Sequence, residues 1–133
     1  MSLTKLEITH ERLFSNGESF GEVGTYQEIT GIAHFSIDPN NPNNNGIIDI
    51  NLAPRNSHGE ISFTSQFVML KPTHQELGNG SVLFDVVNRG RKTVMNVFNS
   101  SSRTNGGDVL IDSGNGFLMR QGYTVVFGGW QYD

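Results

Sequence analysis

Apolar and polar residues alternate along two stretches in the first half of the chain, at about 25–38 and 61–70. A period of two is typical of a β-strand that turns one face to the core and the other to water. Between them, residues 39–46 are rich in Pro and Asn, which is typical of a hairpin loop, and the apolar stretch 47–52 then suits a return strand. The pattern therefore predicts three antiparallel strands at about 25–38, 47–52 and 61–70.

The pattern changes after the Gly78-Asn79-Gly80 turn. The run at 82–87 is almost continuously apolar, as in strands that are buried on both faces. Apolar residues at helical spacing predict a short helix at about 92–99, and a second helix at about 115–121 precedes an apolar strand at about 123–128. A strand, two helices and a strand indicate a parallel pair joined by a crossover. We therefore expect a β-rich α+β fold in which antiparallel strands lead into the start of a parallel sheet.

Length and composition limit the classes of protein that the chain can belong to. Its 133 residues suit a single domain or fragment spanning 1–133, and its 16 glycines favour a turn-rich β protein over a helical bundle. The formal net charge is −4 without a long basic run, so nucleic acid is not an expected partner. No apolar stretch has the length of a membrane helix, and the first residues lack the apolar core of a signal peptide. We expect a soluble chain with no membrane partner, and its compartment stays open.

Few residues in the chain suit metal binding or covalent catalysis. The absence of cysteine excludes disulfides, thiolate metal sites and a cysteine nucleophile. No two histidines have the i, i+4 spacing that places two metal ligands on one helix face. Ser113 lies in Asp112-Ser113-Gly114, which lacks the leading glycine of a G-x-S-x-G nucleophile motif. We therefore expect no metal, no cofactor and no catalytic residue in this chain.

Several short segments resemble the amino-terminal part of an α/β-hydrolase domain. Three of them end predicted elements, namely Asn88-Arg89-Gly90, Arg120-Gln121-Gly122-Tyr123 and Gly128-Gly129-Trp130-Gln131. Two longer strings, at 52–56 and 114–126, are similar to those of an uncharacterised bacterial family with this domain. These motifs describe scaffold, so they support a fold more than a reaction.

The resemblance extends from about Gly17 to the end of the chain and implies a role for each strand. Residues 82–87 would be the third strand of the hydrolase sheet and 123–127 the fourth. In such enzymes the nucleophilic serine follows the fifth strand, and the acid and histidine come later still, so all three would lie beyond Asp133. The resemblance implies a scaffold segment of a serine esterase-like hydrolase that is not catalytic alone. A small-molecule substrate would bind only to a longer parent protein.

The turn after residue 87 is the segment to which the resemblance gives a chemical role. In the hydrolase fold the loop after the third strand donates a backbone N–H to the oxyanion hole, a role that would fall on Asn88, Arg89 and Gly90. Arg89, Arg91 and Lys92 also form the one basic cluster, which could contact a phosphate or carboxylate at a helix start. A plain strand-to-helix turn with solvated cations is the alternative for both sets.

A binding module is the alternative to a hydrolase scaffold. A small β-rich domain can bind a carbohydrate or a protein ligand without catalysing a reaction. Trp130 could then stack on a sugar ring, although an aromatic residue near a strand end can equally pack against the core or its rim.

The resemblance also predicts self-association. In the hydrolase sheet the third strand lies between the fourth and the fifth, so a chain ending after the fourth leaves one edge of 82–87 unpaired. Unpaired apolar edges invite pairing with another chain, and Asp85 is the only charged residue in this run. We therefore expect a homo-oligomer formed through the edge of strand 82–87, most simply a two-fold dimer.

Overall fold

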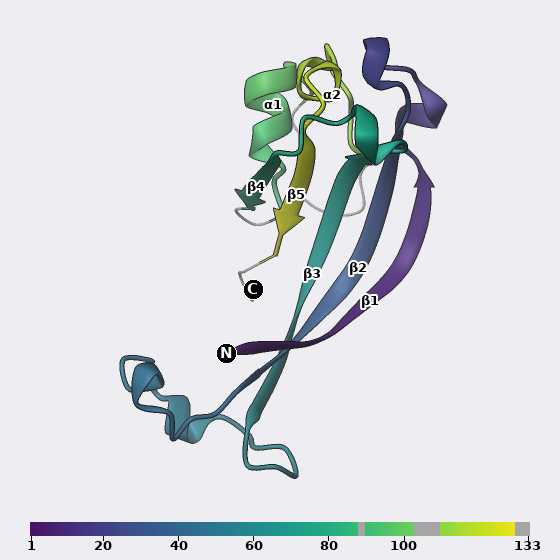
Figure 1. Cartoon of the computed structure of the whole chain (residues 1–133). Helices are drawn as coiled ribbons and strands as arrows, with labels where there is room; N and C mark the ends of the chain where they lie inside the picture. Colours follow the sequence, from purple (N-terminus) through teal and green to yellow (C-terminus); the bar gives the residue numbers. More distant parts are fainter. Residues whose placement is uncertain (88–89, 103–109, 130–133) are drawn as a thin grey trace.

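The structure, a computed structural model, describes residues 1–87, 90–102 and 110–129. Five strands form one mixed sheet in the order β1-β2-β3-β5-β4, accompanied by two short helices (Figure 1). The strands are β1 (Ser2–Leu13), β2 (Tyr26–Ile37), β3 (Ile61–Pro72), β4 (Val82–Val86) and β5 (Thr124–Gly128), and the helices are α1 (Thr93–Asn99) and α2 (Phe117–Arg120). The fold is therefore β-rich and of the α+β class, as the sequence predicts.

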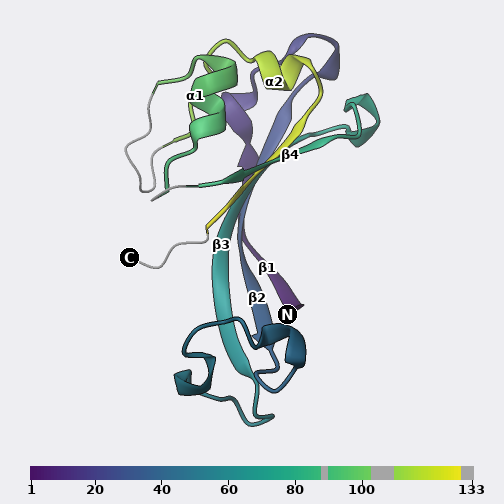
Figure 2. The same cartoon turned by 90° about the vertical axis from the view of Figure 1, so that its left-hand side faces the viewer.

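The sheet consists of a long antiparallel ribbon and a short parallel pair. Strands β1, β2 and β3 pair antiparallel along almost their whole length. β5 joins the ribbon antiparallel to Phe67–Leu70 of β3, and β4 pairs parallel to β5, which confirms the predicted parallel pair. Both views show the helices together at one end of the sheet, while the ribbon continues to the other end, where the segment 38–60 lies (Figures 1 and 2).

The first strand, β1, has no counterpart among the predicted elements because its apolar residues do not keep a period of two. The pairing of β1 with β2 shifts at two places, one next to Thr4 and one next to Thr9. An extra residue at each β-bulge changes the phase of the side chains that follow. Both threonines lie at these bulges and donate a hydroxyl hydrogen bond to a carbonyl of β2, Thr4 to His34 and Thr9 to Thr30, each at 3.1 Å.

The strand predicted at 47–52 is wrong. This segment forms turns that end in a single 3-10 turn at Ile50–Leu52, and Asp49 before it has a left-handed backbone with φ of 58°. β2 and β3 already pair with each other over all twelve residues, so the segment lies past the end of the ribbon with no strand edge beside it. Ile48 and Leu52, which suggested the strand, are 86% and 81% exposed.

The hydrophobic core lies between the helices and one face of the sheet. Tyr26, Leu70 and Val125 are fully buried on adjacent strands and point to this covered face. The helices contribute Met95 from α1 and the neighbouring Leu118 and Met119 from α2. The predicted helix at 92–99 is confirmed, whereas the one at 115–121 is reduced to the four residues of α2. None of the helices in the described ranges is long and apolar enough to cross a membrane.

The second face of β4 is not buried, contrary to the expectation for 82–87. Val82, Phe84 and Val86 point away from the helices and are 64%, 59% and 55% exposed. Leu83 alone of the apolar residues in β4 packs against the core. A continuous apolar run therefore does not distinguish a strand covered on both faces from one that keeps an apolar face open.

The hydroxyl of Tyr26 connects the start of β2 to the end of α2, and it supports a prediction about stability. It is buried and lies 3.0 Å from the carbonyl oxygens of both Met119 and Tyr123, to which it donates. Tyr26→Phe should lower the free energy of unfolding by about 0.5–1.5 kcal/mol, because it removes a buried hydrogen-bond donor, while the Met119 carbonyl keeps the backbone N–H of Gly122. Urea unfolding measures this loss, and Tyr123→Phe is the matched control, since its hydroxyl has no hydrogen bond to the described residues.

The same burial raises the pKa of Tyr26 to about 12 from 10.0. Because the neutral form is favoured in the folded state, this stabilisation is present below pH 10 and is lost as the pH rises through about 12. An ultraviolet titration of the folded protein should show one tyrosine ionising later than the others. A Tyr26→Phe protein that still shows the late step would contradict this assignment.

Candidate functional site at the carboxyl ends of the parallel strands

The parallel strands β4 and β5 end side by side, with Val86 paired to Gly128, and α1 is the next element of the chain after β4. In open sheets with parallel strands, ligands bind at the carboxyl ends of the strands because the turns there can present backbone and side-chain groups. Gly90, Arg91 and Lys92, to which the sequence assigns chemistry, follow β4 in the chain. We therefore take this end of the pair as the candidate site.

The proposed oxyanion loop is represented in the structure by Gly90. Asn88 and Arg89 lie outside the described residues, as does the proposed stacking residue Trp130. Gly90 has φ of 73°, a left-handed backbone conformation that residues other than glycine rarely adopt. The glycine is therefore required by the shape of the turn, and its role as an oxyanion donor stays a prediction.

The two described cations of the basic cluster have different surroundings. Arg91 is exposed, whereas Lys92 is half-buried with its ammonium 6.0 Å from the ring centroid of Phe127 at the end of β5. This is the distance of a cation–π contact, so the charge of Lys92 is held against the candidate site. The ion pairs found in the described ranges involve neither residue. Anion binding by Arg91 and Lys92 stays a prediction.

Asp85 is the residue of this site whose role sequence reasoning missed. One of its carboxylate oxygens accepts a hydrogen bond from the backbone N–H of Val94, at 3.1 Å. The first N–H groups of a helix have no partner within it, and Lys92 at the cap position supplies none. A carboxylate there also interacts favourably with the helix dipole. The signal was present in the sequence, since Asp85 is an acidic residue in an apolar strand that precedes a helix.

Ser113 does not have the surroundings of a nucleophile. Its hydroxyl lies 3.2 Å from that of Ser15 and 3.1 Å from a carboxylate oxygen of Glu18. Ser15 donates to the same oxygen at 2.8 Å, which completes a ring of three side chains. A serine nucleophile needs a base that removes its proton and is itself oriented by a third group. A lone carboxylate shared by two hydroxyls instead stabilises the loop.

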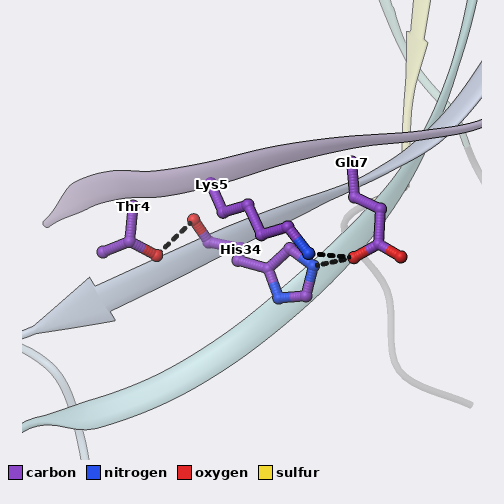
Figure 3. Close-up of polar contacts among 4 residues, drawn as sticks. All are labelled: Thr4, Lys5, Glu7 and His34. Atoms are coloured by element: carbon purple, nitrogen blue, oxygen red, sulfur yellow. Dashed lines mark hydrogen bonds and ion pairs between the residues drawn. The ribbon is translucent and has the colours of Figure 1, made fainter.

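A second polar cluster lies on the ribbon, away from the candidate site (Figure 3). A carboxylate oxygen of Glu7 is 2.7 Å from the ammonium of Lys5 and 3.1 Å from Nε2 of His34. The side-chain hydrogen bonds from Lys5 and His34 lower the pKa of the Glu7 carboxyl. One carboxylate and one imidazole beside a lysine do not make a metal site. The described residues contain no group of three or more His, Cys, Asp or Glu that could hold a metal ion.

A shallow hollow of about 280 Å³ lies at the opposite end of the parallel pair. Its lining consists largely of glycines and neighbouring strand residues, among them Gly78, Gly122, Val82 and Thr124, and contains no charged side chain. Such a lining offers backbone groups and the hydroxyls of Ser81 and Thr124, but no acid or base that could activate them. The hollow therefore does not compete with the carboxyl ends of the strands as a reaction site.

The contact between Asp85 and α1 leads to a testable prediction. Asp85→Ala removes both the acceptor and the charge, so we expect a loss of about 0.5–2 kcal/mol in the free energy of unfolding. Asp85→Asn keeps an acceptor oxygen and should lose less. Chemical denaturation followed by circular dichroism measures both variants, and equal stability of Asp85→Ala and the parent would show that the hydrogen bond to Val94 does not hold the helix.

Comparison with models of protein families, with curated proteins and with solved structures yields no match for this chain. The function must therefore be argued from the fold and from the site itself.

Proposed function

We propose that this chain is a scaffold segment of a serine esterase-like hydrolase, which lacks the nucleophile and does not catalyse the reaction alone. The observation that carries the proposal is the position of β4. It pairs parallel to β5 and stands at the end of the sheet. This is the place expected for a third strand whose fourth is present and whose fifth has yet to be added on the other side.

The turn after β4 gives further support. In the intact enzyme it would provide a backbone N–H to the oxyanion that forms when the serine attacks an ester carbonyl. Gly90 with its left-handed backbone lets the chain turn sharply from the strand end to α1. Asp85 accepts a hydrogen bond from Val94, which ties β4 to the start of that helix. These residues would position the turn, and the bond-breaking step would belong to residues beyond this chain.

The open face of β4 is the feature that a complete hydrolase sheet would change. Parallel strands in α/β proteins are covered on both faces, whereas Val82, Phe84 and Val86 are uncovered here. The proposal thus requires that a longer parent protein supplies a second layer over this face.

The proposal predicts that the isolated chain hydrolyses p-nitrophenyl esters no faster than an inert protein of equal concentration. The physical reason is that no hydrogen bond in the described ranges joins a serine hydroxyl to a histidine ring, and Ser113 hydrogen-bonds only to Ser15 and Glu18 through its side chain. A spectrophotometric assay measures the rate. Turnover that is abolished by Ser113→Ala would contradict the proposal, because it would reveal a nucleophile within this chain.

The coding sequence after Asp133 tests whether the nucleophile motif that the proposal requires is present in a longer protein. A continuation into a strand, a G-x-S-x-G turn and a helix would support the hydrolase scaffold. A stop codon directly after Asp133 would contradict it and favour the binding module.

A further inference from the structure

The face of the sheet opposite the helices forms an apolar surface across all five strands. Side chains alternate along a strand, so the neighbours of the buried residues point to this second face, which we call the open face. Large apolar residues remain exposed on it at both ends of the strand order. On β1 the exposed fractions are 54% for Leu6 and 49% for Ile8, on β3 that of Phe63 is 38%, and on β4 that of Phe84 is 59%.

On the ribbon beyond the helices, the open face is apolar and the opposite face is largely polar. At this end the side chains on the helix side are polar, as in His34 and Thr64, which pair across β2 and β3. The next pair along the strands, Phe35 and Phe63, lies on the open face with the rings stacked at 5.2 Å. A ribbon with one polar and one apolar face has its polar face towards solvent and needs a partner for the other.

Two glycines keep the open face smooth and its aromatic rings ordered. A Cβ atom added to Gly31 would lie 2.6 Å from the ring of Phe67, and one added to Gly128 would lie 2.5 Å from the ring of Phe84. Each ring therefore lies directly over backbone that has no side chain. Rings that are already fixed lose little conformational freedom when a second surface packs on them.

The exposed apolar residues of the open face are unevenly spread over its strands. Eight large apolar residues are exposed on it, four from β1, one from β3 and three from β4. The five on β1 and β3, the neighbours of β2, present on the order of 400 Å² with roughly half of ~150 Å² exposed for each, and half-buried neighbours such as Phe67 and Met69 add to this. A standard interface buries about 800 Å² on each partner.

The charges on the open face indicate that the partner is a second copy. Among the described strand residues, this face carries two charged side chains, Glu11 on β1 and Lys71 on β3. They lie on opposite sides of β2 and two residues apart along it, Glu11 beside Ile29 and Lys71 beside Gln27. Gln27 donates a hydrogen bond to Glu11 at 2.8 Å, which places that carboxylate on the open face.

We infer that two copies of this chain pack through their open faces, with a two-fold axis that runs along β2. This axis exchanges β1 and β3, so Glu11 of each copy faces Lys71 of the other and two equivalent ion pairs form. An interface of this kind is self-complementary, as two-fold symmetry requires. The two sheets then pack in the aligned manner, face to face at about 10 Å. The inference rests on the open face and does not depend on the hydrolase proposal.

Leu6→Lys, among the exposed apolar residues of β1, tests the interface. The parent chain should change from dimer to monomer over a dilution series measured by light scattering. Leu6→Lys should weaken the dimer at least tenfold, because it places a charge in an apolar contact, while the exposed position of Leu6 leaves the monomer folded. Val97→Lys is the matched control, since Val97 is 65% exposed on α1 and belongs to the opposite side of the sheet.

A charge exchange tests the symmetry itself. Glu11→Lys and Lys71→Glu should each weaken the dimer at least tenfold, because each places like charges opposite one another. The double variant should restore the affinity to within about threefold of the parent, since the pairs form again with the signs reversed. Circular dichroism of each variant verifies that the monomer is folded.

Two results would overturn the inference. The first is a parent chain that stays monomeric at every concentration, which would mean that the open face is covered by other parts of a longer protein or stays solvated. The second is a dimer that is unaffected by Leu6→Lys and by the charge exchange but is lost with Phe84→Pro. That pattern would assign the association to the edge of β4, as the sequence predicts.

Discussion

The buried side chain of Asn99 is the interaction on which the helical layer depends. Its amide nitrogen donates to the carbonyl of Ser113 at 2.9 Å, and its amide oxygen accepts from the N–H of Leu118 in α2 at 3.0 Å. A buried amide is tolerated only when its hydrogen bonds are made, and here they join the end of α1 to the start of α2. Helices of seven and four residues are not stable alone in water. They exist because Asn99 and the sheet hold them in place.

Because this helical layer is small, it covers only part of the sheet. β2 and β3 have twelve residues each, and the helices occupy only one end of the sheet (Figure 1). The remaining ribbon has mostly polar side chains on the helix side and mostly apolar ones on the open face. The hydrolase proposal and the dimer both follow from this difference in size between the sheet and the helical layer. In each, another part of a protein packs on an apolar surface that the two short helices do not cover.

The sequence predicts those elements whose pattern is local and undisturbed. A period of two, although broken at Ile32 and Val68, locates β2 and β3, and helical spacing locates α1. It fails for β1, because the bulges beside Thr4 and Thr9 break the period. It also fails for 47–52, where a strand-like composition has no neighbouring edge to pair with. At the candidate site the sequence identifies the glycine and the cations of the turn, but the contacts from Asp85 to Val94 and from Lys92 to Phe127 depend on the fold.

An apolar strand at the end of a sheet offers two surfaces, its backbone edge and its uncovered side chains, and a sequence cannot separate them. The structure does so for β4. Leu83 packs against the core, so the exposed Val82, Phe84 and Val86 belong to the open face, while the edge consists of backbone groups. The same face continues across the sheet to Leu6 and Ile8 on β1, far from that edge in the strand order. Pairing at the edge would leave those residues in water, whereas packing of the faces on either side of β2 covers them, and the hydrophobic effect grows with the area that is covered. The face therefore accounts for more of the exposed apolar surface than the edge does.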